Sequence, residues 1–246
     1  MTAIEAVATY LPEGSVSVAD VLADLGHGER AAAYERYFGF SRVRSDAAQP
    51  LSDQLVAAAR GLGLSADVRR EVRYVVHAPT IAFAAPYDRP VTAVVARRLG
   101  MDRAACFTVS QHACASPFIA LDVVAGLLRE DERRESLPPG TLRGLVLAGE
   151  KTFTDEARHI PDSAVMGEGT AAVLVSSADP STGSGDLVVG YGSRTWGEFH
   201  AAPFLSAEEQ ARFDAMYVEG LAAVVEETVD QAGVPCAEVA ALLPHQ

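Results

Sequence analysis

The sequence predicts an α/β protein built from two related halves, the second of them incomplete. Strand-like and helix-like segments alternate along most of the 246 residues, a pattern typical of helices packed on a sheet. Apart from Arg143, the segment Leu142–Gly149 is continuously apolar, as strands are when helices cover both faces of their sheet. A helix that ends at glycine, a short acidic link and a strand ending in histidine occur twice, leading to His77 and to His245. The echo indicates a duplicated unit.

Each element follows from a local signal. Apolar residues at helical spacing, closed by glycine, predict helices at Ser17–Leu25, Ser52–Leu62, Val91–Leu99, from about Cys114, and at Ala207–Ala232. Short runs of β-branched and apolar residues predict strands at residues 4–10, Glu71–His77, Cys106–Val109, Leu142–Gly149 and Glu238–Leu243. Met166–Val175 is predicted to be a glycine turn that leads into a strand, and Leu187–Tyr191 to begin a second set of elements. Glu130–Gly140 and Lys151–Asp162 are predicted polar loops. Pro180–Gly185 is the predicted linker, so we expect the halves to span residues 1–180 and 186–246.

Cys114 lies where a predicted strand passes into a predicted helix. From Phe118 to Leu128 this helix is apolar on nearly every side, with Asp122 its only charge, which predicts a buried helix. Pro117 fits the first turn, where a helix tolerates proline. Free N–H groups and the positive end of the helix dipole favour thiolate over thiol there, so Cys114 is a candidate nucleophile. The alternative is a cysteine that only fills space in the core.

Composition narrows the remaining functions. Three irregularly spaced cysteines argue against a disulfide framework and favour a reducing cytoplasm. No Cys-x-x-Cys or His-x-x-x-His pair signals a metal site, and no apolar run approaches the roughly 20 residues that span a membrane. A net charge of −13 argues against a nucleic-acid partner, because phosphate binding needs a basic face.

Other segments leave alternatives open. Tyr34–Arg44 is aromatic and basic, and is either a packed loop or a ligand-facing loop led by Arg36 or Arg42. The glycine turn at Met166 matches neither a phosphate loop nor a dinucleotide fingerprint. Four histidines are predicted to be structural or solvated: His77, His112, His159 and His200.

Three motifs in register resemble the thiolase-fold condensing enzymes. They are Ala-Cys-Ala-Ser at Ala113–Ser116, Val-Met-Gly-Glu-Gly-Thr-Ala-Ala-Val at Val165–Val173, and the terminal Pro-His-Gln ending at Gln246. Within that group the chain is similar to β-ketoacyl-(acyl carrier protein) synthase III and its acyltransferase relatives in secondary metabolism. The resemblance implies a thiolase-like five-layer αβαβα fold and a cytoplasmic homodimer.

The resemblance also implies site residues. The family nucleophile falls on Cys114, the histidine of its His-Gln-Ala-Asn motif on His245, and its coenzyme A-contacting arginine on Arg36. The third catalytic residue, an asparagine in a Gly-Asn-Thr/Ser motif, lies further along, so we expect the chain to stop inside the His-Gln-Ala-Asn motif. Pro117 replaces a usual glycine, and this departure favours a role in specialised metabolism.

The expected activity is acyl transfer through Cys114 from an acyl-CoA or acyl-carrier-protein thioester. The acceptor is either a malonyl thioester, in a decarboxylative Claisen condensation, or a hydroxyl or amine. His245 is expected to hydrogen-bond a thioester carbonyl or deprotonate the acceptor. No resident cofactor is expected, because the CoA or phosphopantetheine thioester is the substrate. The alternatives are a non-catalytic or fragmentary partner subunit of a condensing-enzyme complex, and a cysteine hydrolase.

Overall fold

The computed structural model describes residues 1–80, 90–152, 154–161, 163–177, 185–199 and 205–243. The chain divides into a larger unit, Thr2–Leu187, and a smaller unit, Val188–Gln246 with Met1. The predicted linker Pro180–Gly185 lies outside the described residues except for Gly185. The division into halves at 1–180 and 186–246 therefore stays a prediction.

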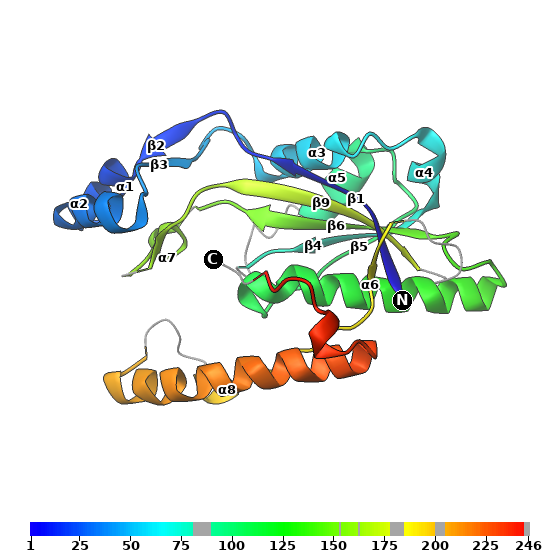
Figure 1. Ribbon diagram of the computed structural model, residues 1–246. Coiled ribbons are helices and arrows are strands. Elements are labelled where there is room, and N and C mark those ends of the chain that lie inside the picture. Colours follow the sequence, from blue (N-terminus) through cyan, green and yellow to red (C-terminus); the bar gives the residue numbers. More distant parts are fainter. Residues whose placement is uncertain (81–89, 153, 162, 178–184, 200–204, 244–246) are drawn as a thin grey trace. The chain divides into compact units, whose positions relative to one another are not determined.

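A six-stranded mixed sheet forms the centre of the larger unit, in the order β10-β1-β9-β6-β4-β5 (Figure 1). Its strands are β1 (Thr2–Tyr10), β4 (Val72–Ala78), β5 (Ala105–Thr108), β6 (Arg143–Glu150), β9 (Gly169–Ser177) and β10 (Asp186–Val188). β4 pairs in parallel with β5 and with β6, whereas β9 runs antiparallel to β6 and β1. The carboxyl ends of β4, β5 and β6 consequently meet at one edge of the sheet.

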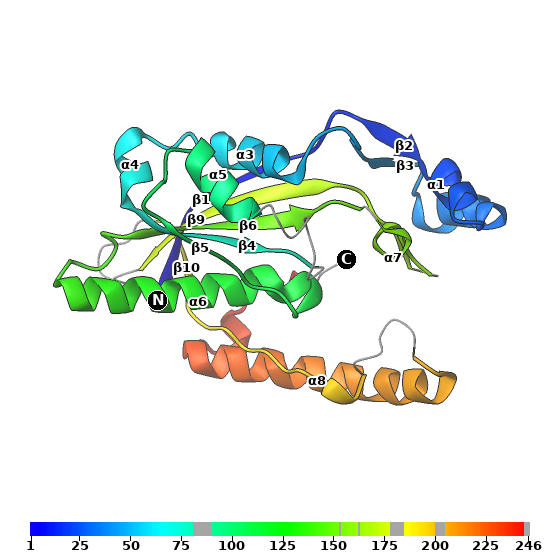
Figure 2. The ribbon, with the colours of Figure 1, turned by 180° about the vertical axis from the view of Figure 1, so that it is seen from behind.

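Helices cover both faces of this sheet (Figure 2). α3 (Leu51–Gly61) and α5 (Val91–Arg98) pack on one face and α6 (Ser116–Glu135) on the other. Neighbouring residues of a strand point to opposite faces, so Leu145 joins the core under α3 and α5 while Val146 joins the core under α6. Leu142–Gly149 is thus confirmed as a strand covered on both sides.

The remaining elements are short or peripheral. They are β2 (Ser15–Ser17), α1 (Val18–Asp24), α2 (Ala31–Ala33), a π-helical turn (Tyr34–Phe38), β3 (Arg42–Arg44), α4 (Ala66–Glu71), α7 (Asp155–Arg158), β7 (His159–Ile160) and β8 (Ala164–Val165). β2 pairs with β3 and β7 with β8. Because Ser65 caps α4, the predicted acidic link before β4 is largely helical.

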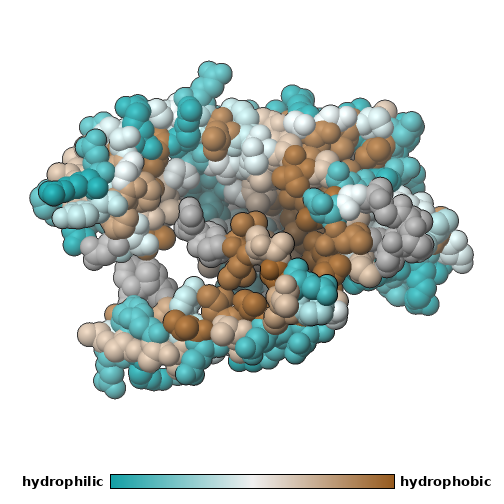
Figure 3. Space-filling view, in the orientation of Figure 1, coloured by the Kyte–Doolittle hydropathy of each residue, from teal (hydrophilic) through white to brown (hydrophobic). Residues whose placement is uncertain are grey.

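Two expectations about α6 are wrong. The helix is not buried on every side, because the sheet covers only one stripe of it; Phe118 is 59% exposed, and Val123 and Leu127 are also exposed. The space-filling view also shows hydrophobic residues exposed at the surface (Figure 3). The helix also runs through the predicted loop as far as Glu135, stabilised by the ion pair Glu130–Arg133 at 2.7 Å and ended by Ser136 at φ 56°.

The smaller unit is built around α8 (Ala207–Ala232), which has the predicted bounds. Ser206 and Glu209 form a capping box at its start, and Gly233 ends it at φ 64°. No helix among the described residues is long and apolar enough to cross a membrane.

The predicted strand Glu238–Leu243 is not formed. Glu238 belongs to a single 3-10 turn, Cys236–Glu238, and residues 239–243 have no regular structure. An isolated strand leaves its backbone hydrogen-bonding groups unpaired, and none of the described strands pairs with this segment. Leu243 is accordingly 90% exposed.

Candidate functional site

Cys114 lies on a strained corner between β5 and α6. The chain turns through Gln111 at φ 79° and Ala113 at φ 45°, values that residues other than glycine seldom adopt. A single 3-10 turn, Ala113–Ala115, follows, and α6 begins at Ser116. Cys114 therefore precedes the helix by two residues instead of opening it. It is exposed, so it does not fill space in the core.

Ser116 stabilises this corner from the core side. This residue is fully buried, and its hydroxyl donates a hydrogen bond of 2.8 Å to the carbonyl oxygen of Ala113. The bond closes the strained turn on the first residue of α6. Because α6 is itself packed on the sheet, the position of Cys114 is fixed by the core.

Two polar residues from other strand ends reach the corner. Thr80 follows β4, and its hydroxyl donates to the Cys114 sulfur at 4.0 Å. The Thr80 backbone N–H donates to a carboxylate oxygen of Glu150, the last residue of β6. Sequence reasoning missed both residues. Their shared signal is that each lies at or just beyond the carboxyl end of a parallel strand, where sites of α/β sheets gather.

His77 supports this edge from within the sheet. It is 2% exposed, and its Nε2 lies 2.8 Å from the carbonyl oxygen of Gly149. A carbonyl only accepts, so Nε2 carries the proton. Burial lowers the pKa of His77, against the opposing effects of the Gly149 hydrogen bond and the Glu150 charge. His77 is thus a buried, structural histidine, as predicted.

The lowered pKa of His77 makes stability depend on pH. Between the folded pKa and the ordinary value of 6.5, the unfolded chain binds a proton that the folded chain rejects. This contribution is complete above about pH 6.5 and is lost as the pH falls below it. We expect urea unfolding at pH 7.5 and 5.5 to show a drop in stability of up to about 1 kcal/mol that is absent from His77→Gln, whose amide still donates to Gly149. An equal drop in the variant would contradict the assignment.

Glu168, from the glycine turn at Met166, lies in a buried polar cluster. It is 4% exposed, and its Oε2 accepts from Lys151 Nζ at 2.8 Å and from Gln54 Nε2 at 2.9 Å. Lys151 Nζ also donates to the carbonyl oxygens of Asp46 and Gln49. The glutamate and lysine together tie the end of β6 to the segment that leads into α3. The glycine turn at Met166 therefore positions Glu168 for a buried ion pair with Lys151.

Arg36 lies on the exposed π-helical turn Tyr34–Phe38. Its guanidinium sits over the ring of Tyr37, 5.6 Å from the centroid, and Tyr37 itself is 74% exposed. Arg42, the other candidate of this segment, is held by the side chain and carbonyl oxygen of Ser15 at 3.0 and 2.8 Å. The coenzyme A-binding role of Arg36 stays a prediction.

The other predicted histidines divide into two groups. His245 and His200 lie outside the described residues, so the pairing of Cys114 with His245 remains a prediction. His159 is buried, and its Nε2 is 2.9 Å from the hydroxyl of Tyr34. His112 begins the 3-10 turn that carries Cys114, as its N-cap residue.

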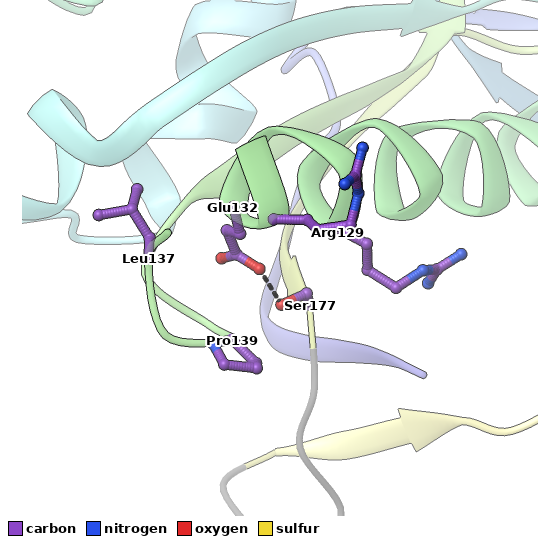
Figure 4. Close-up of a pocket in the computed structure, with 6 residues that line it drawn as sticks. Arg129, Glu132, Leu137, Pro139 and Ser177 are labelled. Carbon is purple, nitrogen blue, oxygen red and sulfur yellow. Dashed lines mark hydrogen bonds between the residues drawn. The ribbon is translucent and has the colours of Figure 1, made fainter. Parts of the chain in front are cut away.

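A cavity of about 200 Å³ lies toward the other end of α6 (Figure 4). It is lined by Arg129, Glu132, Arg133, Leu137, Pro139 and Ser177. The Glu132 carboxylate accepts from the Ser177 hydroxyl and, at 2.9 Å, from the Leu142 N–H, so it fastens the helix end to the sheet. About five helical turns separate Glu132 from Cys114, and the cavity is not part of the site around that residue.

No family model matches the sequence, and no curated protein matches it. Solved structures do match. The acyltransferase ChlB3 is 18% identical with a TM-score of 0.67, over 96% of this chain and 72% of ChlB3. The 3-oxoacyl-[acyl-carrier-protein] synthase III of Aquifex aeolicus VF5 is 18% identical with a TM-score of 0.64, over 97% and 74%. OleA of Xanthomonas campestris, with bound lauric acid and lauroyl-CoA, is 15% identical with a TM-score of 0.68, over 96% and 75%.

These neighbours are condensing and acyl-transferring enzymes of thiolase-like fold. At such identities the likeness establishes the fold alone. The chain therefore has the thiolase-like α/β fold that its three motifs predict.

Proposed function

We propose that the protein is an acyltransferase of the condensing-enzyme kind, which takes an acyl group from an acyl-CoA or acyl-carrier-protein thioester onto Cys114. The observation that carries the proposal is the exposed Cys114 on a strained corner, at the sheet edge where three parallel strands end. A nucleophile held on a strand-to-helix corner is a recurrent arrangement in enzymes that form covalent intermediates. The names of the structural neighbours support the same class of reaction.

The first half-reaction forms one bond and breaks one. The Cys114 thiolate attacks the thioester carbonyl carbon, and the carbonyl oxygen takes up the negative charge of the tetrahedral intermediate. We assign the Cys114 backbone N–H as one hydrogen-bond donor to this oxygen. Collapse of the intermediate expels the thiol of CoA or phosphopantetheine, which leaves as thiolate and takes a proton from water. The product is an S-acyl cysteine.

The second half-reaction transfers the acyl group to an acceptor. In condensation, a malonyl thioester loses CO₂, and the resulting carbanion attacks the acyl carbonyl and expels Cys114 as thiolate. In ester or amide formation, a hydroxyl or amine attacks instead and gives up its proton. We assign His245 to this step, either as a hydrogen-bond donor to the malonyl thioester carbonyl or as the base for the acceptor.

Intact-protein mass spectrometry with added acyl-CoA, followed by each acceptor in turn, tests the proposal. We expect an acyl adduct that disappears when the correct acceptor is added. A β-ketoacyl product with CO₂ identifies condensation, and an ester or amide identifies O- or N-acylation. Release of free acid without an acceptor would favour the hydrolase. Absence of any adduct from acyl-CoA and acyl-carrier protein would overturn the proposal in favour of a non-catalytic subunit.

A further inference from the structure

We propose that Thr80 and Glu150 are positioning residues for Cys114. Thr80 orients and stabilises the reactive form of the sulfur, and Glu150 acts through Thr80. The inference rests on the proposed function in one respect, namely that Cys114 is the nucleophile. It adds two residues that none of the three sequence motifs contains.

Thr80 donates two hydrogen bonds, one to Glu150 and one to Cys114. Its backbone N–H donates to the Glu150 carboxylate, and its hydroxyl donates to Cys114 Sγ at 4.0 Å. The first bond fixes the residue at the end of β4, so the second can be directed at the sulfur. Donation to sulfur stabilises thiolate more than thiol, because charged acceptors form the stronger hydrogen bonds.

Glu150 is held by its two neighbours in the chain. The carbonyl of Gly149 accepts from buried His77 at 2.8 Å, and the ammonium of Lys151 is bound to Glu168 at 2.8 Å. Gly149 has φ 116°, and a Cβ there would meet the carbonyl oxygen of Gly169 at 2.3 Å. The backbone on both sides of Glu150 is therefore anchored, which fixes the position from which its carboxylate holds Thr80.

The charge of Glu150 and its hydrogen bond act on Cys114 with opposite signs. A negative charge disfavours thiolate, so removal of the charge alone would speed the reaction of Cys114 with an electrophile. Loss of the Thr80 orientation would slow it. The direction of the change in Glu150→Ala therefore separates positioning from simple electrostatics.

Alkylation of Cys114 by iodoacetamide across pH measures this directly and needs no acyl substrate. The full chain carries Cys236→Ser, because Cys236 is also exposed, and peptide mass spectrometry follows Cys114. We expect Thr80→Val to slow alkylation at pH 7 about three- to tenfold. Thr80→Ser keeps the donor and should stay near wild type. Glu150→Gln keeps an acceptor for the Thr80 N–H and removes only the charge, so it should react at least as fast as wild type.

Glu150→Ala is expected to slow alkylation at pH 7 as Thr80→Val does. An unchanged rate in Thr80→Val, or a faster one in Glu150→Ala, would overturn the positioning role. Thermal melts of each variant verify that it is folded. Failure of the proposed function appears elsewhere, as a missing acyl adduct on the wild-type chain with a normal alkylation profile, so the two failures are distinguishable.

Discussion

Replacement of Cys114 by alanine is expected to abolish the acyl adduct and to lower acyl transfer at least about a thousandfold. The variant keeps the corner, because the turn is closed by Ser116 and Ala113 and not by the cysteine side chain. What is lost is the only group at this corner able to form a thioester, and removal of a covalent nucleophile costs factors of this size or larger. Steady-state assays and intact-protein mass spectrometry measure both losses.

Cys236→Ser is the matched control for this variant. Cys236 is exposed like Cys114 but lies in the 3-10 turn Cys236–Glu238 of the smaller unit. We expect it to retain the adduct and the transfer rate. An adduct that persists in Cys114→Ala and vanishes in Cys236→Ser would move the nucleophile to the other cysteine.

Gly144→Val is expected to destabilise the larger unit by about 2 to 3 kcal/mol. Gly144 lies on β6 under α6, and a Cβ at this position would meet Cγ1 of Val124 at 2.2 Å and Cγ2 of Val175 at 3.4 Å. The helix thus lies too close to the sheet for a side chain at position 144. A valine must push α6 outward, and α6 carries the Cys114 corner at its start, so acyl-adduct formation should fall as well.

Gly126→Ala is the opposite case on the same helix. Among the described residues, the nearest atom that a Cβ at Gly126 would meet is the flexible end of Arg129, at 3.9 Å. Alanine in a helix interior is favoured over glycine, so this variant should gain about 0.5 to 1 kcal/mol. Urea unfolding of both variants gives the two signs, and equal stabilities for wild type and Gly144→Val would refute the close-approach account.

Local signals predicted much of the fold. The helix Ala207–Ala232 could be recognised because its spacing is amphipathic and because a capping serine and a closing glycine flank it directly. The strand Leu142–Gly149 could be recognised because burial on both faces requires a continuous apolar run.

The errors arise where distant partners decide the structure. Glu238–Leu243 has the composition of a strand, but a strand forms only beside another strand. The apolar run Phe118–Leu128 has the composition of a buried helix, yet one sheet covers only one of its sides. Composition indicates which secondary structure and burial are possible for a segment, and the elements packed against it decide which of them forms.

The residues of the candidate site likewise divide into those that local sequence predicts and those that only the tertiary structure reveals. Cys114 could be predicted because the strand, the corner and the helix that position it are consecutive in the chain. Thr80 and Glu150 could not be predicted in this way. They are 34 and 36 positions from Cys114 in the sequence, and it is the strand order β6-β4-β5 that connects them to Cys114 through hydrogen bonds. The sequence signal available for Thr80 and Glu150 was their position as polar residues just beyond the end of a predicted strand.

The central claim is that the sulfur of Cys114 accepts the acyl group, and peptide mapping of the wild-type protein tests it most directly. The chain is incubated with acyl-CoA, digested at mildly acidic pH to preserve thioesters, and sequenced by tandem mass spectrometry. The account predicts the acyl mass on the peptide that contains Cys114, with the Cys106 and Cys236 peptides unmodified. An acyl group found on either of those cysteines, or on none of the three, would contradict it.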